Sequence, residues 1–166
     1  MGRRRNKNKV FSNLEVIDAG AKGKTIAKAP DGKVVFLPNA VPGDIVDVQT
    51  FKQRSGYYEG KATVFHKLSD KRTQAACEHF GTCGGCKWQH MDYSHQLFYK
   101  EKEVVNNLKR IGHLELPEIT PILGSKDHYF YRNKMEFSFS DSRWLTQEEI
   151  ASEKNLGDRN ALGFHI

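Results

Sequence analysis

The sequence predicts a β-rich α+β protein, in which a five-stranded barrel is followed by a small α+β domain with a cysteine-rich metal loop. Two observations lead to this fold class. Five short runs rich in β-branched and aromatic residues, separated by turn signals, occupy the first 68 residues. All three cysteines then fall between residues 77 and 86, ahead of one long amphipathic pattern. With 166 residues and 38% apolar content, the chain has room for one or two small domains.

The predicted strands of the barrel cover residues 14–17, 25–29, 33–37, 44–51 and 57–65. Turn residues separate the later runs: Asp31-Gly32, Pro42-Gly43 and Arg54-Ser55-Gly56. Five short strands with this spacing are typical of an OB-like barrel. Such barrels bind single-stranded nucleic acid across a strand face edged by loops.

Positive charge is concentrated in the N-terminal half of the chain. Residues 1–76 carry 15 Lys and Arg against 7 Asp and Glu, a net charge of +8, whereas residues 77–166 carry 11 against 13, a net charge of −2. This imbalance favours RNA binding, because neutralising phosphates releases condensed counterions. We expect the RNA surface to draw on the basic and aromatic residues of the barrel: Lys22, Lys24, Lys28, Lys33, Lys52, Arg54, Lys61, Phe51, Tyr57 and Tyr58. A protein-interaction module with an ordinary coat of solvated lysines is the alternative.

The remaining pattern divides the chain into segments. Residues 1–9 form a basic flexible arm that either touches RNA or only aids solubility. The barrel spans 10–68, a polar linker follows at 69–76, and the metal-loop domain spans 77–166. Within that domain, residues 94–111 predict an amphipathic helix with Ser94 as its N-cap and Gly112 as its stop.

A period-two pattern at residues 129–140 predicts a strand. We expect Tyr131, Met135, Phe137 and Phe139 to pack, and Arg132, Lys134 and Glu136 to face solvent or ligand. The run Arg132, Asn133 and Lys134 offers both phosphate and base-edge contacts, so we place it near RNA. A short helix at Gln147 to Lys154 and a strand beginning at Leu162 complete the prediction.

Cys77, Cys83 and Cys86 are the candidate metal ligands, because thiolates bind soft or borderline metals and Gly84 and Gly85 permit a tight turn beneath them. One interpretation is a [4Fe-4S] cluster whose fourth ligand lies outside this chain. A second is a zinc site of three cysteines and one histidine, drawn from His79, His90 or His95. Buried thiols, or a disulfide with one cysteine left over, are the alternatives without a metal.

No apolar run is long enough to span a bilayer, and no apolar segment follows the N-terminal arginines as a secretory signal requires. We therefore expect no membrane partner and a cytoplasmic protein, in which thiols stay reduced. We also expect a monomer.

The cysteine loop, the following Lys87-Trp88-Gln89-His90 and the run from Tyr131 to Phe137 closely resemble the N-terminal half of iron-sulfur RNA (uracil-5-)-methyltransferases, with the 23S rRNA-modifying branch fitting best. The strand and turn sequences between residues 10 and 68 look like the TRAM domain of that family. This resemblance implies an OB-like RNA-binding barrel, a domain with a [4Fe-4S] cluster and, beyond these, an S-adenosylmethionine domain. It also implies RNA, above all rRNA, as the partner.

Much of that machinery is absent from this sequence. It has no glycine-rich cofactor loop and no cysteine after Cys86. The resemblance implies that the nucleophilic cysteine, the general base and the fourth cluster ligand all lie beyond residue 166. We therefore expect an N-terminal fragment that is inactive by itself and has no catalytic or cofactor-binding residues of its own. The alternative is a stand-alone RNA-binding protein with a TRAM domain and a zinc knuckle.

Overall fold

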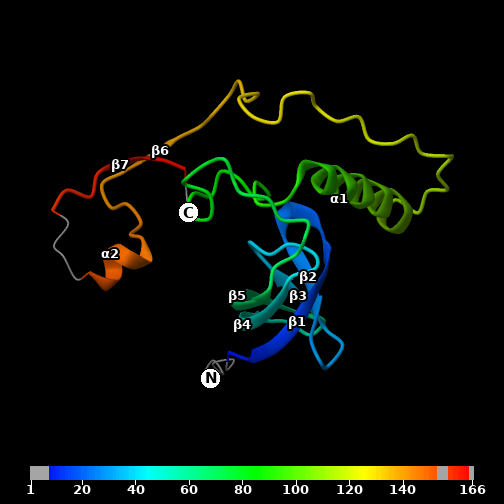
Figure 1. Ribbon diagram of the computed structural model, residues 1–166, viewed down its shortest axis with the longest axis horizontal. Helices are drawn as coiled ribbons and strands as arrows, with labels where there is room; N and C mark the ends of the chain where they lie inside the picture. The colour runs from blue at the N-terminus through cyan, green and yellow to red at the C-terminus, as the bar shows by residue number, and fades with distance from the viewer. Residues whose placement is uncertain (1–7, 153–156, 165–166) are drawn as a thin grey trace, which may run out of the picture. The chain divides into compact units, whose positions relative to one another are not determined.

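The computed structural model describes residues 8–152 and 157–164. The five predicted strands form a closed barrel (Figure 1). They are β1 (Val10–Ala19), β2 (Thr25–Lys28), β3 (Val34–Leu37), β4 (Ile45–Gln53) and β5 (Tyr57–Lys67). Around the barrel they follow the order β1-β2-β3-β5-β4, with β3 parallel to β5 and the other neighbours antiparallel. The predicted OB-like barrel is confirmed.

The barrel core follows from the alternation along each strand, because successive side chains point to opposite faces. The buried cluster inside the barrel consists of Leu14, Val16, Ala27, Ala29, Val35, Leu37, Ala40, Val46, Val48 and Tyr58. At Gly60 the β4 and β5 strands approach closely: a Cβ there would lie 2.7 Å from Val48 Cγ1 and 2.9 Å from the carbonyl oxygen of Gln49. A side chain at residue 60 would therefore push these strands apart.

The three predicted turns are also present, each closed by a backbone hydrogen bond. Gly32 donates to Ala29, Asp44 donates to Val41 and Arg54 donates to Tyr57, each at 2.9 Å. A fourth connection, between β1 and β2, contains the short 3-10 turn Ala21–Gly23.

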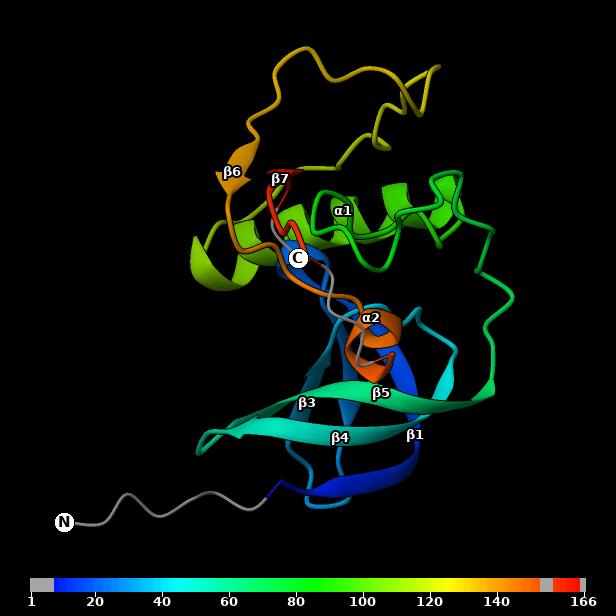
Figure 2. The ribbon, with the colours of Figure 1, turned by 90° about the vertical axis from the view of Figure 1, so that its left-hand side faces the viewer.

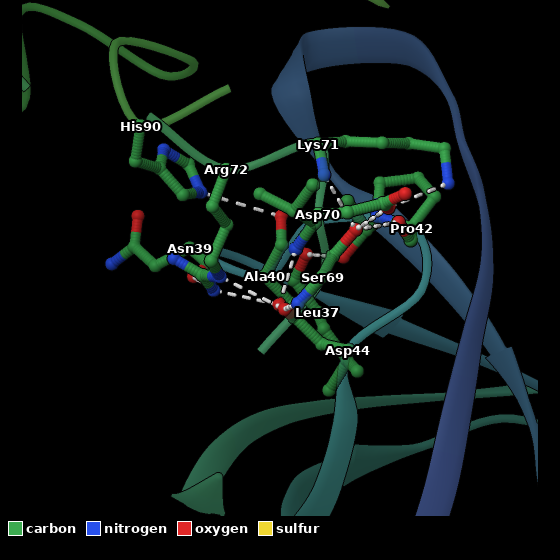
Figure 3. Close-up of polar contacts among 12 residues, drawn as sticks. Leu37, Asn39, Ala40, Pro42, Asp44, Ser69, Asp70, Lys71, Arg72 and His90 are labelled. Carbon is green, nitrogen blue, oxygen red and sulfur yellow. Dashed lines mark hydrogen bonds and ion pairs between the residues drawn. The ribbon is translucent and has the colours of Figure 1, made fainter. Parts of the chain in front are cut away.

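A buried aspartate joins the barrel to the chain that leaves it (Figure 3). The Asp44 carboxylate is fully buried and accepts two hydrogen bonds from Arg72, at 2.8 Å from Nε and 2.6 Å from Nη2. It also accepts the backbone N–H groups of Val41 and Ser69, at 2.7 and 2.9 Å. The Ser69 hydroxyl donates to the carbonyl of Pro42 at 2.7 Å. The segment expected to be a linker is therefore tied to the barrel at Ser69 and Arg72.

Burial disfavours the charged form of Asp44, but the hydrogen bonds from Arg72, Ser69 and Val41 outweigh that effect and hold the pKa of the carboxyl below its ordinary 3.8. A carboxylate with a lowered folded-state pKa stabilises the fold fully above its unfolded pKa. That contribution is lost as the pH falls through the lower folded-state value.

The long helix α1 (Tyr93–Asn106) lies across one end of the barrel in both ribbon views (Figure 2). Met91 and Tyr99 pack there against Ala19 and Val41, with Trp88 beside them. Two further contacts join the helix segment to the rest of this unit: Lys102 Nζ lies 2.7 Å from Asp18 Oδ2, and the backbone N–H of Asp92 donates to Lys71 at 2.9 Å.

The helix agrees with the prediction at its C-terminal end, where one π-helical turn, η2 (Asn107–Ile111), runs up to Gly112. Its N-cap is Asp92 and not Ser94, because the Asp92 carboxylate accepts the backbone N–H of Ser94 at 2.9 Å. Of the predicted apolar positions, Val104, Leu108 and Ile111 remain exposed.

The chain divides into two compact units, one of residues 1–75 and 87–124 and the other of 76–86 and 125–166. The second unit contains β6 (Ser138–Ser140), α2 (Gln147–Ala151) and β7 (Ala161–Gly163), with β6 antiparallel to β7. The predicted ends of the last helix and strand, 153–154 and 165–166, and most of the basic arm, 1–7, lie outside the described residues. Within the described part of the chain, no helix is long and apolar enough to cross a membrane.

The expected strand at residues 129–140 is wrong except at its end. Only residues 138–140 have a paired strand, and Tyr131, Met135, Phe137 and Phe139 are all exposed. The reason is that a period-two pattern becomes a strand only where a partner accepts its hydrogen bonds, and β7 supplies three residues.

We predict that Asp44→Asn lowers the free energy of unfolding by about 3 kcal/mol at pH 7, because it leaves the partly buried Arg72 charge without its counter-ion. Urea unfolding measures the change. The matched control is Asp70→Asn, whose carboxylate is 92% exposed and should cost less than about 0.5 kcal/mol. Equal midpoints for the two variants would contradict the anchoring role of Asp44.

Candidate nucleic-acid interface and cysteine loop

Two of the predicted RNA-binding lysines meet over one carboxylate on the outside of the barrel. Lys24 precedes β2 and Lys52 lies near the end of β4, yet their Nζ atoms lie 2.8 and 2.5 Å from the two oxygens of Glu59 on β5. Hydrogen bonds from Lys24 and then Lys52 lower the pKa of Glu59 to about 2. Glu59 therefore stays ionised at neutral pH, and the trio carries a net charge of one positive unit.

The other predicted cations lie around the same barrel. Lys22 adopts a positive φ of 60° in the turn between β1 and β2. Lys28 is exposed at the end of β2, Arg54 is exposed in the turn between β4 and β5, and Lys61 is exposed on β5. Their side chains are open to an anionic ligand.

The consecutive tyrosines Tyr57 and Tyr58 face opposite sides of β5. Tyr57 is on the outside, where its ring centroid lies 5.5 Å from that of Phe36 in an edge-to-face arrangement. Tyr58 is fully buried in the barrel, and its hydroxyl donates to Asp31 at 2.7 Å. The prediction that Tyr58 belongs to the RNA surface is wrong, because the strand alternation turns it inward. Lys33, expected on that surface too, lies with its Nζ 5.4 Å from the Tyr58 ring centroid.

Sequence reasoning missed three residues of this region: Phe36, Glu59 and Lys87. Alternation alone places Phe36 and Glu59 on the outside, because each is next to a buried residue, Val35 or Tyr58, and this signal was available. Nothing in the sequence indicates that Lys87 packs against the turn between β1 and β2.

That packing depends on Gly23. Its φ is +71°, and a Cβ there would lie 2.5 Å from Lys87 Cβ. The Trp88 indole donates to the carbonyl of Gly23 at 3.2 Å. Lys87 is thereby placed beside Lys22 and Lys24, although more than sixty residues separate them in the sequence.

The cysteine loop turns tightly, as the glycines predict. The backbone N–H groups of Thr82 and Cys83 both donate to the carbonyl of His79, at 3.2 and 2.9 Å, and Gly81 has a φ of +95°. The N–H of Gly85 donates to the sulfur of Cys83 at 3.4 Å. Cys83 is half-buried, whereas Cys77 and Cys86 are exposed. A Cβ at Gly85 would lie 3.3 Å from the Phe164 ring, so the chain after β7 passes beside the loop.

The donor set of three thiols with an N–H···S hydrogen bond fits a thiolate-ligated metal centre in its chemistry. In the described part of the chain, however, no three His, Cys, Asp or Glu side chains converge as ligands. Of the histidines weighed for a zinc site, His79 is exposed and lies 3.5 Å from Glu78. His90 is buried at 3.4 Å from the carbonyl of Ala40, and burial lowers its pKa.

The expected contacts Arg132, Asn133 and Lys134 lie in an irregular, exposed segment of the second unit. Arg132 Nε donates to the carbonyl of Lys134 at 3.0 Å, and Lys134 Nζ lies 2.9 Å from Glu136. Both charged groups of that ion pair are more than four-fifths exposed, at 85% and 81%. The three side chains are accessible to a ligand without being held in one arrangement.

Comparison with known families decides the identity of the barrel, because residues 12–63 match the TRAM domain model. The barrel belongs to the TRAM family. The TRAM match covers β2, β3 and β4 completely, together with most of β1 and β5. It therefore includes Lys24, Lys52 and Glu59.

The whole chain is similar to proteins named RNA methyltransferase. One from Bacteroides thetaiotaomicron, named uncharacterized RNA methyltransferase, is 53% identical over 88% of this chain and 32% of its own length. One of the same name from Porphyromonas gingivalis is 42% identical over 92% of this chain and 33% of its own. The 23S rRNA (uracil(1939)-C(5))-methyltransferase RlmD of Francisella tularensis subsp. novicida is 37% identical over 81% of this chain and 30% of its own. The chain therefore spans about a third of the length of these curated relatives, and the matched part is N-terminal.

We predict that Gly23→Ala destabilises the protein more than Gly32→Ala. Both glycines have a positive φ, which costs about 1–2 kcal/mol for alanine, but only residue 23 also meets Lys87, because nothing lies within 4 Å of residue 32. Urea unfolding measures the difference. Trp88 fluorescence in a Trp144→Phe background reports on the local packing. Equal unfolding with unchanged Trp88 emission would refute the packing of Lys87 on this turn.

Proposed function

We propose that this chain is the RNA-binding N-terminal part of a longer S-adenosylmethionine-dependent methyltransferase that modifies C5 of a uracil in 23S rRNA. The observation that carries the proposal is the cationic, aromatic outer face of a TRAM barrel, in a chain that is similar to the N-terminal third of RNA methyltransferases. The 166 residues bind and orient RNA. The catalytic cysteine, the general base and the methyl-donor site belong to the part of the longer protein that this chain does not span.

The RNA surface that we propose combines the barrel cations and Tyr57 with the exposed run of the second unit: Lys22, Lys24, Lys28, Lys52, Arg54, Tyr57, Arg132, Asn133 and Lys134. Exposed ammonium and guanidinium groups bind phosphate without reading sequence, so this surface supplies affinity and orientation. The protein acts as a monomer in the cytoplasm.

We predict that the 166-residue chain binds single-stranded RNA with an affinity that falls steeply as salt rises. The double variant Lys24→Ala/Lys52→Ala should bind more weakly, and the slope of log affinity against log salt should shrink by about 2, since each lost phosphate contact removes about 1. Fluorescence anisotropy across a salt series measures both quantities. Arg132→Ala/Lys134→Ala tests the second unit in the same way.

The matched control is Lys100→Ala/Lys109→Ala, which removes two exposed lysines from the α1–η2 helix and changes the net charge equally. An unchanged slope in Lys24→Ala/Lys52→Ala, or an equal loss in the control, would show that net charge alone governs binding. No RNA binding at low salt would remove the proposed function.

We also propose that Cys77, Cys83 and Cys86 hold a [4Fe-4S] cluster in the longer protein, with a fourth thiolate from beyond residue 166. The contact between Gly85 and Phe164 supports this arrangement, because the chain following β7 starts from beside the loop. The cluster would organise the loop and not transfer electrons, since methyl transfer to uracil C5 involves no net redox change. The N–H of Gly85 would donate to its sulfur environment.

We predict that the longer protein, purified without oxygen, contains iron and inorganic sulfide in equal amounts with visible absorption, and that Cys83→Ser loses both. Thr82→Ser, in the same loop, is the matched control and should retain them. Metal and sulfide analysis provides the measurement. One equivalent of zinc without sulfide would instead favour the zinc-knuckle RNA-binding protein, and a reading frame without a methyltransferase domain would establish it.

A further inference from the structure

The outer face of β2, β3 and β5 carries an aromatic pair framed by aliphatic side chains. Phe36 and Tyr57 lie with ring centroids 5.5 Å apart and an interplanar angle of 76°. The strand register places Ile26 opposite Phe36, and Val34 opposite Tyr57. All four side chains are half-buried, whereas their neighbours along the strands, such as Val35 and Tyr58, fill the barrel. The result is a flat apolar platform on the solvent side of the sheet.

Cations stand at two edges of this platform. Glu59 lies opposite both Phe36 and Lys52 in the register, so the ammonium groups of Lys52 and Lys24 that it binds are beside the Phe36 ring. The lysine side chains remain 41% and 42% exposed, whereas Glu59 is only 13% exposed. Lys28 lies opposite Val34 in the second row. The shared carboxylate thus fixes where two ammonium groups lie and leaves their outer sides open.

We propose that this platform takes a nucleobase of single-stranded RNA, stacked on Phe36 and Tyr57, with an adjoining phosphate on Lys24 and Lys52. The inference rests on the proposed RNA-binding function and adds to it the form of the RNA and the residues that receive a base. Every base has a π-face that stacks on an aromatic ring, and lysines at the edge track the backbone. Bases within an A-form duplex are stacked on one another and do not offer that face.

The charge alone suits any polyanion, including an acidic peptide. The aromatic pair favours RNA, because a flat ring is complementary to a base, whereas an acidic peptide would use the lysines and leave Phe36 and Tyr57 without a function. The aromatic rings and the cations therefore require different probes.

The test uses the whole 166-residue chain and a single-stranded oligoribonucleotide with one 2-aminopurine, whose fluorescence is quenched by stacking. Wild-type protein should quench it. Phe36→Leu and Tyr57→Leu should reduce affinity about 5- to 150-fold each and weaken the quenching, in keeping with the range for loss of one stacked base. Leucine keeps the site apolar, and a thermal melt of each variant confirms that it is folded.

The matched control is Phe98→Leu. Phe98 forms a comparable edge-to-face pair with Tyr99 on α1, at 5.1 Å and 81°, away from the platform. It should leave RNA affinity within twofold of wild type. A duplex RNA of the same sequence and polyglutamate of similar charge are the comparison ligands, and both should bind at least tenfold more weakly than the single strand.

The outcomes separate the two proposals. If wild-type protein binds no RNA, the proposed function and the platform both fall. If it binds RNA while folded Phe36→Leu and Tyr57→Leu bind and quench as well as wild type, only the platform falls. Equal binding of duplex RNA or of polyglutamate would likewise overturn the platform, the second in favour of a protein partner. Loss confined to the two platform variants supports it.

Discussion

The buried carboxylate of Asp44 is the interaction on which the arrangement of the first unit depends. Four hydrogen bonds, two from Arg72 and one each from the backbone of Val41 and Ser69, hold the chain that leaves β5 against the turn before β4. An ionised carboxylate is costly to bury unless its lone pairs are satisfied, so this network permits few alternatives. From there the chain leads to Met91 and Tyr99, which pack α1 on the barrel end.

The same anchoring shapes the candidate RNA surface. Because the segment after the cysteine loop packs on the turn at Gly23, Lys87 joins a surface that otherwise belongs to the barrel. On the strands themselves, alternation performs two tasks at once: one face fills the core, and the other presents Phe36, Tyr57 and the lysines. A barrel this small cannot bury both faces, and its outer face is available for a ligand.

The structure separates a well-packed binding module from a part with few internal contacts. In the second unit, α2 has a capping box formed by Thr146 and Glu149, and β6 pairs with β7, but Tyr131, Phe137 and Phe139 stay exposed. This unit also contains the cysteine loop, whose donor chemistry suits a thiolate-bound centre although its sulfurs do not converge with other ligands in the described residues. The chain spans about a third of the length of its curated relatives, so the proposed methyl transfer belongs to a larger protein.

The sequence by itself determined the five strands, their turns, the helix after residue 92 and the gathering of all cysteines in one loop, because alternation, turn residues and helical periodicity are local properties. It also identified Lys24, Lys52 and Tyr57 as candidates. Only the tertiary structure decided that Lys24 and Lys52 share Glu59, that Tyr57 faces out while Tyr58 faces in, and that residues 129–137 are not a strand. These features depend on strand register and on the presence of a pairing strand, and both arise between segments that are distant in the sequence.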